Sequence, residues 1–146
     1  MHPNPAFRRQ SHAQNVEMAR KRAFGVLVVN NELGPLMSHV PFLLDVEGRF
    51  ADLHLVRSNP IARMNDAPSV IAVSGADGYV SPDWYGVDDQ VPTWNYVAVH
   101  LRGTLRRLPD EELEGLLNRQ SAFFENRLSP KLPWTSGKMS DGVLQK

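Results

Sequence analysis

The feature that most constrains the fold is a series of short apolar runs, each followed by turn-forming residues. The runs at 24–29, 36–44 and 69–75 are rich in Val, Leu and Ile. Clusters of Asn, Asp, Gly and Pro separate them, as at 30–35 and 45–48. Apolar runs of roughly four to eight residues between such clusters are typical of β-strands at hairpin spacing. The chain is therefore predicted to form mainly antiparallel β-structure.

Two further strands complete the predicted set. In 49–56, Ala51, Leu53 and Leu55 alternate with polar residues, which is typical of a strand with one wet or ligand-lined face. The second is the long segment 96–108, which alternates in the same way. Together with 24–29, 36–44 and 69–75 these make five predicted strands.

Three helices are predicted around the strands. The first runs from Ser11, its N-cap, to Arg22. A short one covers 60–64, and a later amphipathic one begins at 109–112 with Asp110 as its N-cap. This order predicts a mainly β, α+β domain: a small antiparallel barrel with peripheral helices.

Composition narrows the function classes. The 146 residues suit one domain, and 16 basic residues balance 16 acidic ones. A DNA-binding domain usually carries a basic excess, and the short basic clusters here are interpreted as solvated surface. The absence of cysteine excludes disulfides and thiolate sites. The start, 1–5, has no apolar signal stretch and no run is long enough to span a bilayer, so a cytoplasmic location is expected.

The segment 79–96 concentrates aromatic residues. It holds two of the three tryptophans and all three tyrosines. Such residues can form the walls of a site for a flat ligand, or an interface between subunits. The alternative is that they seal the mouth of the barrel.

Two other patterns could carry chemistry. Segment 57–60 joins a strand to a helix start, where Arg57 and backbone N–H groups could hold a phosphate; an ordinary capped helix is the alternative. His39, His54 and His100 lie on three predicted strands and could form a metal or haem site. No ligand spacing supports that site, so hydrogen-bonded polar histidines are favoured. No metal ligands and no catalytic residues are assigned.

Two phrases of the sequence are long and rich in aromatic residues: Tyr-Val-Ser-Pro-Asp-Trp-Tyr and Val-Pro-Thr-Trp-Asn-Tyr. They are the most specific of five phrases that resemble the PaiB family of FMN-binding transcriptional regulators. The resemblance covers residues 1 to about 134, and the five phrases lie at 1–7, 38–45, 54–60, 79–85 and 91–100.

The resemblance implies the split β-barrel fold of pyridoxamine-phosphate-oxidase-like flavoproteins. In that superfamily two chains form a homodimer, and FMN lies in a groove between them. The implied function is that of an FMN-binding negative transcriptional regulator or flavin-dependent sensor, and DNA contact follows from the family label alone. The alternatives are a flavin-dependent oxidoreductase, a haem-binding split barrel and a cofactor-free dimerisation module.

The resemblance also implies roles for five residues of the strand region. Ser38 and His39 would line the flavin groove. His54, Arg57 and Asn59 would hold the phosphate and ribityl end, with Arg57 supplying the positive charge.

Five aromatic-segment residues complete the implied site. Trp94, Asn95 and Tyr96 would approach the isoalloxazine ring or close the dimer around it, and Trp84 and Tyr85 would support that wall.

The chain departs from the family pattern at its end. Residues 1–128 are expected to form the FMN-binding domain, followed by a tail at 129–146 that is shorter than in relatives. The tail is expected to be truncated, and truncation would expose one sheet edge and could abolish cofactor binding.

Overall fold

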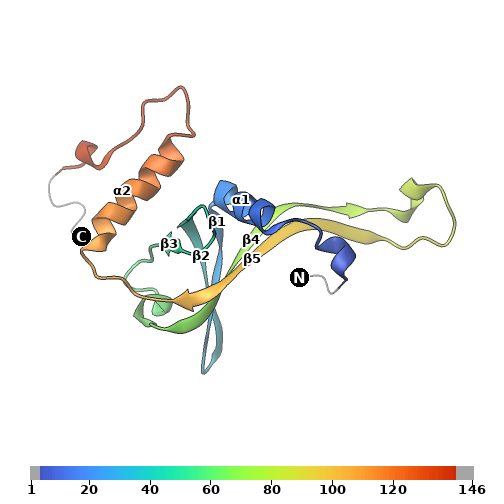
Figure 1. Cartoon of the computed structure of the whole chain (residues 1–146), viewed down its shortest axis with the longest axis horizontal. Coiled ribbons are helices and arrows are strands. Elements are labelled where there is room, and N and C mark those ends of the chain that lie inside the picture. Colours follow the sequence, from blue (N-terminus) through green and yellow to red (C-terminus); the bar gives the residue numbers. More distant parts are fainter. Residues whose placement is uncertain (1–3, 141–146) are drawn as a thin grey trace.

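A computed structural model describes residues 4–140 as a five-stranded antiparallel sheet with two α-helices (Figure 1). The strand order is β3-β2-β1-β4-β5. The strands are β1 (Phe24–Asn31), β2 (Gly34–Leu44), β3 (Ala51–Leu53), β4 (Ala67–Val80) and β5 (Thr93–Leu105). The helices are α1 (His12–Arg22) and α2 (Glu112–Glu125), with short 3₁₀ turns η1 (Pro5–Phe7), η2 (Pro60–Arg63), η3 (Pro82–Tyr85) and η4 (Ser136–Lys138). This confirms the predicted mainly β, α+β class of split-barrel type.

One face of the sheet forms the core. Because side chains alternate along a strand, every second residue of β1, β2 and β4 faces the same side. Helix α1 covers this face with Val16 and Ala19, and η2 adds Ile61, which is 1% exposed. The buried strand residues in this cluster are Leu27, Val29, Val40, Phe42, Leu44, Ile71, Val73 and Val99.

Helix α1 begins as the sequence predicts. The Ser11 hydroxyl accepts a hydrogen bond from the Gln14 backbone N–H at 3.2 Å. The Gln14 side-chain oxygen accepts one from the Ser11 N–H at 2.9 Å. This reciprocal pair satisfies two N–H groups that a helix start leaves unpaired, which fixes the first turn.

The β4–β5 hairpin extends far beyond the rest of the sheet. Strand β1 pairs with β4 only from Ser69 to Ala72, whereas β4 and β5 remain paired out to Val80 and Thr93. We call residues 75–97 the arm; it projects away from the body of the molecule (Figure 1). At its base, a Cβ added to Gly75 would lie 2.9 Å from the Met18 side chain, so α1 packs closely where the arm begins.

Two strand predictions need correction. The predicted strand 49–56 is reduced to Ala51–Leu53, because the chain then leaves β2 and turns toward η2. The predicted strand 69–75 extends to Val80 instead of ending before the aromatic segment. The cause is a ladder partner distant in sequence, since Tyr79 pairs with Trp94 across the hairpin.

Two further boundaries differ from the prediction. Strand β5 covers Thr93–Leu105 rather than 96–108. Asp110 does not cap α2, whose N-cap is Glu111 without a side-chain cap bond. The Asp110 carboxylate accepts a hydrogen bond from the Arg107 guanidinium at 2.9 Å instead. An ion pair with the preceding loop has therefore replaced the expected cap.

Candidate functional site

The best-defined polar contact among the predicted site residues joins β2 to η2. The Asn59 side-chain amide donates to the Ser38 hydroxyl at 3.1 Å, and both residues are half-buried. The Asn59 oxygen accepts from the Ile61 N–H at 3.0 Å, and Ile61 lies in the core. Asn59 is thus fixed at both ends of its amide, and Ser38 and Asn59 form one cluster.

Arg57 sits in a tight turn beside this cluster. The Asn59 backbone N–H donates to the Val56 carbonyl at 2.9 Å, so Arg57 and Ser58 occupy the two central positions. The turn leaves Arg57 exposed. A guanidinium held at a turn next to a hydroxyl and an amide is a suitable donor set for an anionic oxygen ligand.

His54 contributes a polar atom without a partner. Its ring Nδ1 is buried and makes no hydrogen bond within residues 4–140. Buried polar atoms of this kind are uncommon, because an unmade hydrogen bond leaves the cost of desolvation uncompensated. His54 lies in the loop that leads from β3 to η2, five residues before Asn59.

A second positive charge lies near Arg57 and was missed by the sequence analysis. The Arg107 guanidinium bonded to Asp110 lowers the pKa of that carboxyl, and the charge of Arg57 acts in the same direction. Arg107 also donates its backbone N–H to Asn65 at 3.0 Å, which ties this loop to the end of η2. In the sequence, Arg107 belongs to a basic pair interpreted as solvated surface; nothing local indicates its proximity to Arg57.

The sheet face opposite the core carries His39 and His100. The register places His39, Val26, Ala72 and His100 in one row across four strands, and directly opposed residues share a face. With strands about 4.8 Å apart, the two histidines are separated by about 14 Å. The His39 ring stacks on Phe24 with centroids 6.4 Å apart, a neighbour that the sequence analysis did not identify.

The surroundings of His100 disfavour the charged form of its imidazole. Burial of the imidazole lowers the pKa of His100, and the positive charge of Arg102 lowers it further. Within residues 4–140 no group of three or more histidine or carboxylate side chains is placed to hold a metal ion. The three histidines of the suggested metal site are therefore not gathered together.

The aromatic residues lie on the arm. Trp94 and Tyr96 project to one face of β5 and Asn95 to the other, since successive residues alternate. Tyr79 shares the face of Trp94, with ring centroids 6.3 Å apart, and the Trp94 indole N–H donates to Asp77 at 3.1 Å.

The two remaining aromatic residues of the predicted site lie at the arm tip. Trp84 and Tyr85 belong to η3, and their side chains are 73% and 49% exposed.

The predicted site residues therefore form two groups that do not meet within one chain. Ser38 lies in the row of Leu101, seven residues from Trp94 along β5 and three strands across. That is about 23 Å along the strand and about 14 Å across the sheet. The strand-region residues and the arm residues cannot surround the same small ligand in a single copy of the chain.

The family described as "Putative FMN-binding domain" matches residues 1–146. The protein named "Protease synthase and sporulation protein PAI 2" from Bacillus subtilis is 28% identical over 142 residues, covering 88% of this chain and 68% of that protein. An uncharacterised protein of Saccharomyces cerevisiae, YKL070W, is 30% identical over 101 residues, covering 63% of this chain and 59% of its own length.

No helix among the described residues is long and apolar enough to cross a membrane. The homodimer and the cytoplasmic location remain predictions, and DNA contact still rests on the family label alone. The family match covers the whole chain and agrees with the phrases noted in the sequence. The chain therefore belongs to the family of FMN-binding domains, with FMN as its cofactor, and is similar to the sporulation protein PAI 2.

Proposed function

We propose that the chain holds FMN by its phosphate and ribityl end at the corner between β2 and η2. The observation that carries this is the Asn59–Ser38 hydrogen bond of 3.1 Å, which joins β2 to the start of η2 two residues after Arg57. Arg57 would pair with the phosphate, while Asn59 and Ser38 would hydrogen-bond the ribityl hydroxyls. His54 would gain the partner that it lacks.

The donor set supports a phosphorylated, hydroxyl-rich ligand. A guanidinium favours a phosphate because it offers several N–H donors in a fixed plane. A hydroxyl, an amide and an imidazole can both donate and accept, which suits a chain of alcohol groups. Bound FMN would supply a redox-active ring, whose chemistry belongs to the cofactor.

The ring end would be completed by a second copy of the chain. The arm carries Trp94 and Tyr96 too far from Ser38 for both groups to contact one FMN in cis. We therefore propose a homodimer in which arm residues of one copy face the β2–η2 corner of the other. His39, on the opposite sheet face from Ser38, would line the groove between them.

We propose a regulatory or sensory role rather than turnover. The support is the similarity to a relative whose name refers to sporulation. The formal net charge of zero does not favour direct DNA contact, so this role would operate through FMN and chain pairing. A flavin-dependent oxidoreductase is the alternative, and oxidation of a reduced nicotinamide by the FMN-loaded protein would support it.

Comparing two flavins tests the phosphate assignment. Riboflavin shares the ring and ribityl chain with FMN but lacks the phosphate. We expect riboflavin to bind about 10- to 150-fold more weakly, because hydrogen bonds to a charged group contribute about 1.5–3 kcal/mol. Titration of flavin fluorescence measures both affinities. Equal affinities would show that no group of the protein holds the phosphate.

A further inference from the structure

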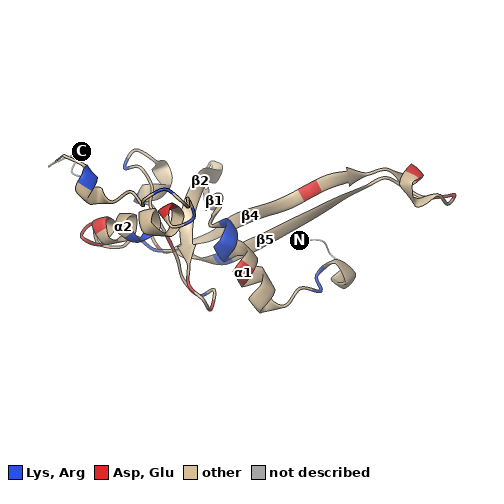
Figure 2. Ribbon diagram, turned by 90° about the horizontal axis from the view of Figure 1, so that it is seen from above, with Lys and Arg blue, Asp and Glu red and all other residues tan. Residues whose placement is uncertain are grey.

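Two segments of the neutral chain carry an excess of opposite charge. The arm contains four aspartates, Asp77, Asp83, Asp88 and Asp89, and no lysine or arginine. In contrast, residues 4–23 contain five basic side chains and one acidic one. In Figure 2 the arm carries acidic residues, in red, and no basic ones, whereas the basic residues of α1, in blue, lie at its C-terminal end.

Beyond its base, where α1 packs against Gly75, the arm pairs with no third strand of the described residues. Beyond Val73 it consists of two strands, and such isolated hairpins are at best marginally stable in water. It nevertheless exposes large apolar side chains, with Trp84 at 73% and Trp94 at 58%. Aromatic residues of this kind are enriched at protein interfaces. The arm therefore has the composition of a segment that is covered by a partner.

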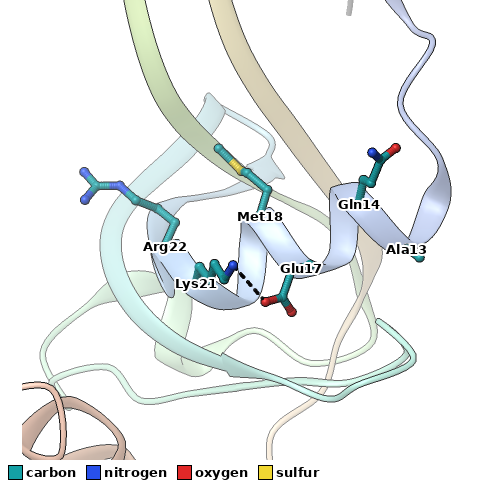
Figure 3. Close-up of a pocket in the computed structure, with 6 residues that line it drawn as sticks. All are labelled: Ala13, Gln14, Glu17, Met18, Lys21 and Arg22. Carbon is teal, nitrogen blue, oxygen red and sulfur yellow. Dashed lines mark ion pairs between the residues drawn. The ribbon is translucent and has the colours of Figure 1, made fainter.

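The outer surface of α1 has the complementary character. An open depression of about 740 Å³ lies along the helix (Figure 3) and is lined by Ala13, Gln14, Glu17, Met18, Lys21 and Arg22. Lys21 forms an ion pair with Glu17 at 3.2 Å, while Arg22 makes no ion pair within residues 4–140. The depression thus combines an apolar floor with a positive rim.

The arm cannot occupy this depression in its own chain. It leaves the body at Gly75, next to Met18, and its tip at η3 lies at the far end of the hairpin (Figure 1). A second copy has the same acidic arm and the same basic helix. Two copies related by a two-fold axis would therefore make the contact twice, each arm meeting the other helix.

We propose that the acidic, aromatic arm of one copy docks along α1 of a second copy, so that two chains exchange arms. This inference deepens the proposed homodimer and rests on it. The aromatic residues would bury apolar surface, while Asp83 and Asp88 would approach Lys21 and Arg22. Opposite charges of this kind direct pairing and exclude incorrect partners. Salt weakens exposed charge pairs, so dimer affinity should fall as ionic strength rises.

Charge reversal tests the exchange. The helix variant carries Lys21→Glu and Arg22→Glu, and the tip variant carries Asp83→Lys and Asp88→Lys. Each variant brings like charges together at both contacts. We expect the dissociation constant of the dimer to rise at least about tenfold. The matched control carries Arg119→Glu and Lys138→Glu and should leave the dimer unchanged, because both residues are exposed and lie outside α1 and the arm. As in the test pair, one of the two, Arg119, forms an ion pair, here with Asp52. Light scattering gives the mass, and far-UV circular dichroism confirms that each variant is folded.

Mixing the two variants distinguishes exchange from any other dimer. In a mixed pair, the acidic arm of the helix variant meets a basic helix, and the basic arm of the tip variant meets an acidic helix. Both contacts are restored, so dimers should form in the mixture but not in either variant alone. A monomeric wild-type chain, variants that stay dimeric, or folded variants that fail to pair when mixed would each overturn the exchange.

The FMN absorbance of the same fractions separates this inference from the proposed function. A monomer that retains FMN overturns the arm exchange and leaves FMN binding intact. A charge-dependent dimer that retains no FMN supports the exchange and contradicts the cofactor site.

Discussion

Replacing Arg57 by alanine is expected to weaken FMN binding by about 1.5–3 kcal/mol, or about 10- to 150-fold. The reason is that Arg57, exposed at the turn before Asn59, supplies the charge proposed to hold the phosphate. The same change should leave riboflavin affinity nearly unaltered, because riboflavin has no phosphate. Fluorescence titration of both flavins against wild type and variant gives the four affinities required.

The control for this prediction is Arg63→Ala. Arg63 is also exposed and lies in η2, a few residues further along the chain. It should change FMN affinity little. If Arg57→Ala reduces the affinities for FMN and riboflavin equally, the arginine supports the fold of the corner rather than the phosphate. If it reduces neither, the assignment is wrong.

Replacing Phe42 by alanine is expected to lower the free energy of unfolding by about 3–5 kcal/mol. Phe42 is fully buried in β2, and its N–H is bonded to the Ala23 carbonyl at 3.0 Å. Truncation leaves a cavity that the surrounding strands cannot close, because the backbone there is fixed by ladder pairs. A chain of this size has a total stability of about 7–22 kcal/mol, so the loss is a large share.

Phe50→Ala is the matched control for this effect. Its side chain is 68% exposed, so the expected loss is below about 1 kcal/mol. Urea denaturation measures the free energy of unfolding of both variants. The comparison requires that the dependence of this free energy on urea concentration stay the same. Equal losses for Phe42 and Phe50 would mean that the described face of the sheet is not the core.

Local signals explain which parts of the fold could be predicted. The Ser11–Gln14 capping box and the apolar run at 24–29 act over a few residues, and α1 and β1 form as expected. The arm was not predicted, because the pairing of Tyr79 with Trp94 joins segments separated by an acidic, proline-containing connector. Its length depends on this pairing rather than on local propensity.

In the candidate site, too, local patterns identified some residues, and residues that depend on distant neighbours were missed. Ser38 and Asn59 were both assigned from the sequence, and the structure joins them by a hydrogen bond. The FMN-binding roles of all ten residues remain predictions. Arg107 and Phe24 were missed because each depends on neighbours distant in sequence.

The most direct test of the account is the absorbance spectrum and mass of the protein after incubation with FMN and desalting. The account predicts flavin bands at about one FMN per chain, on a particle with the mass of two chains. A colourless protein, whether it has the mass of one chain or of two, would contradict the FMN site at the β2–η2 corner.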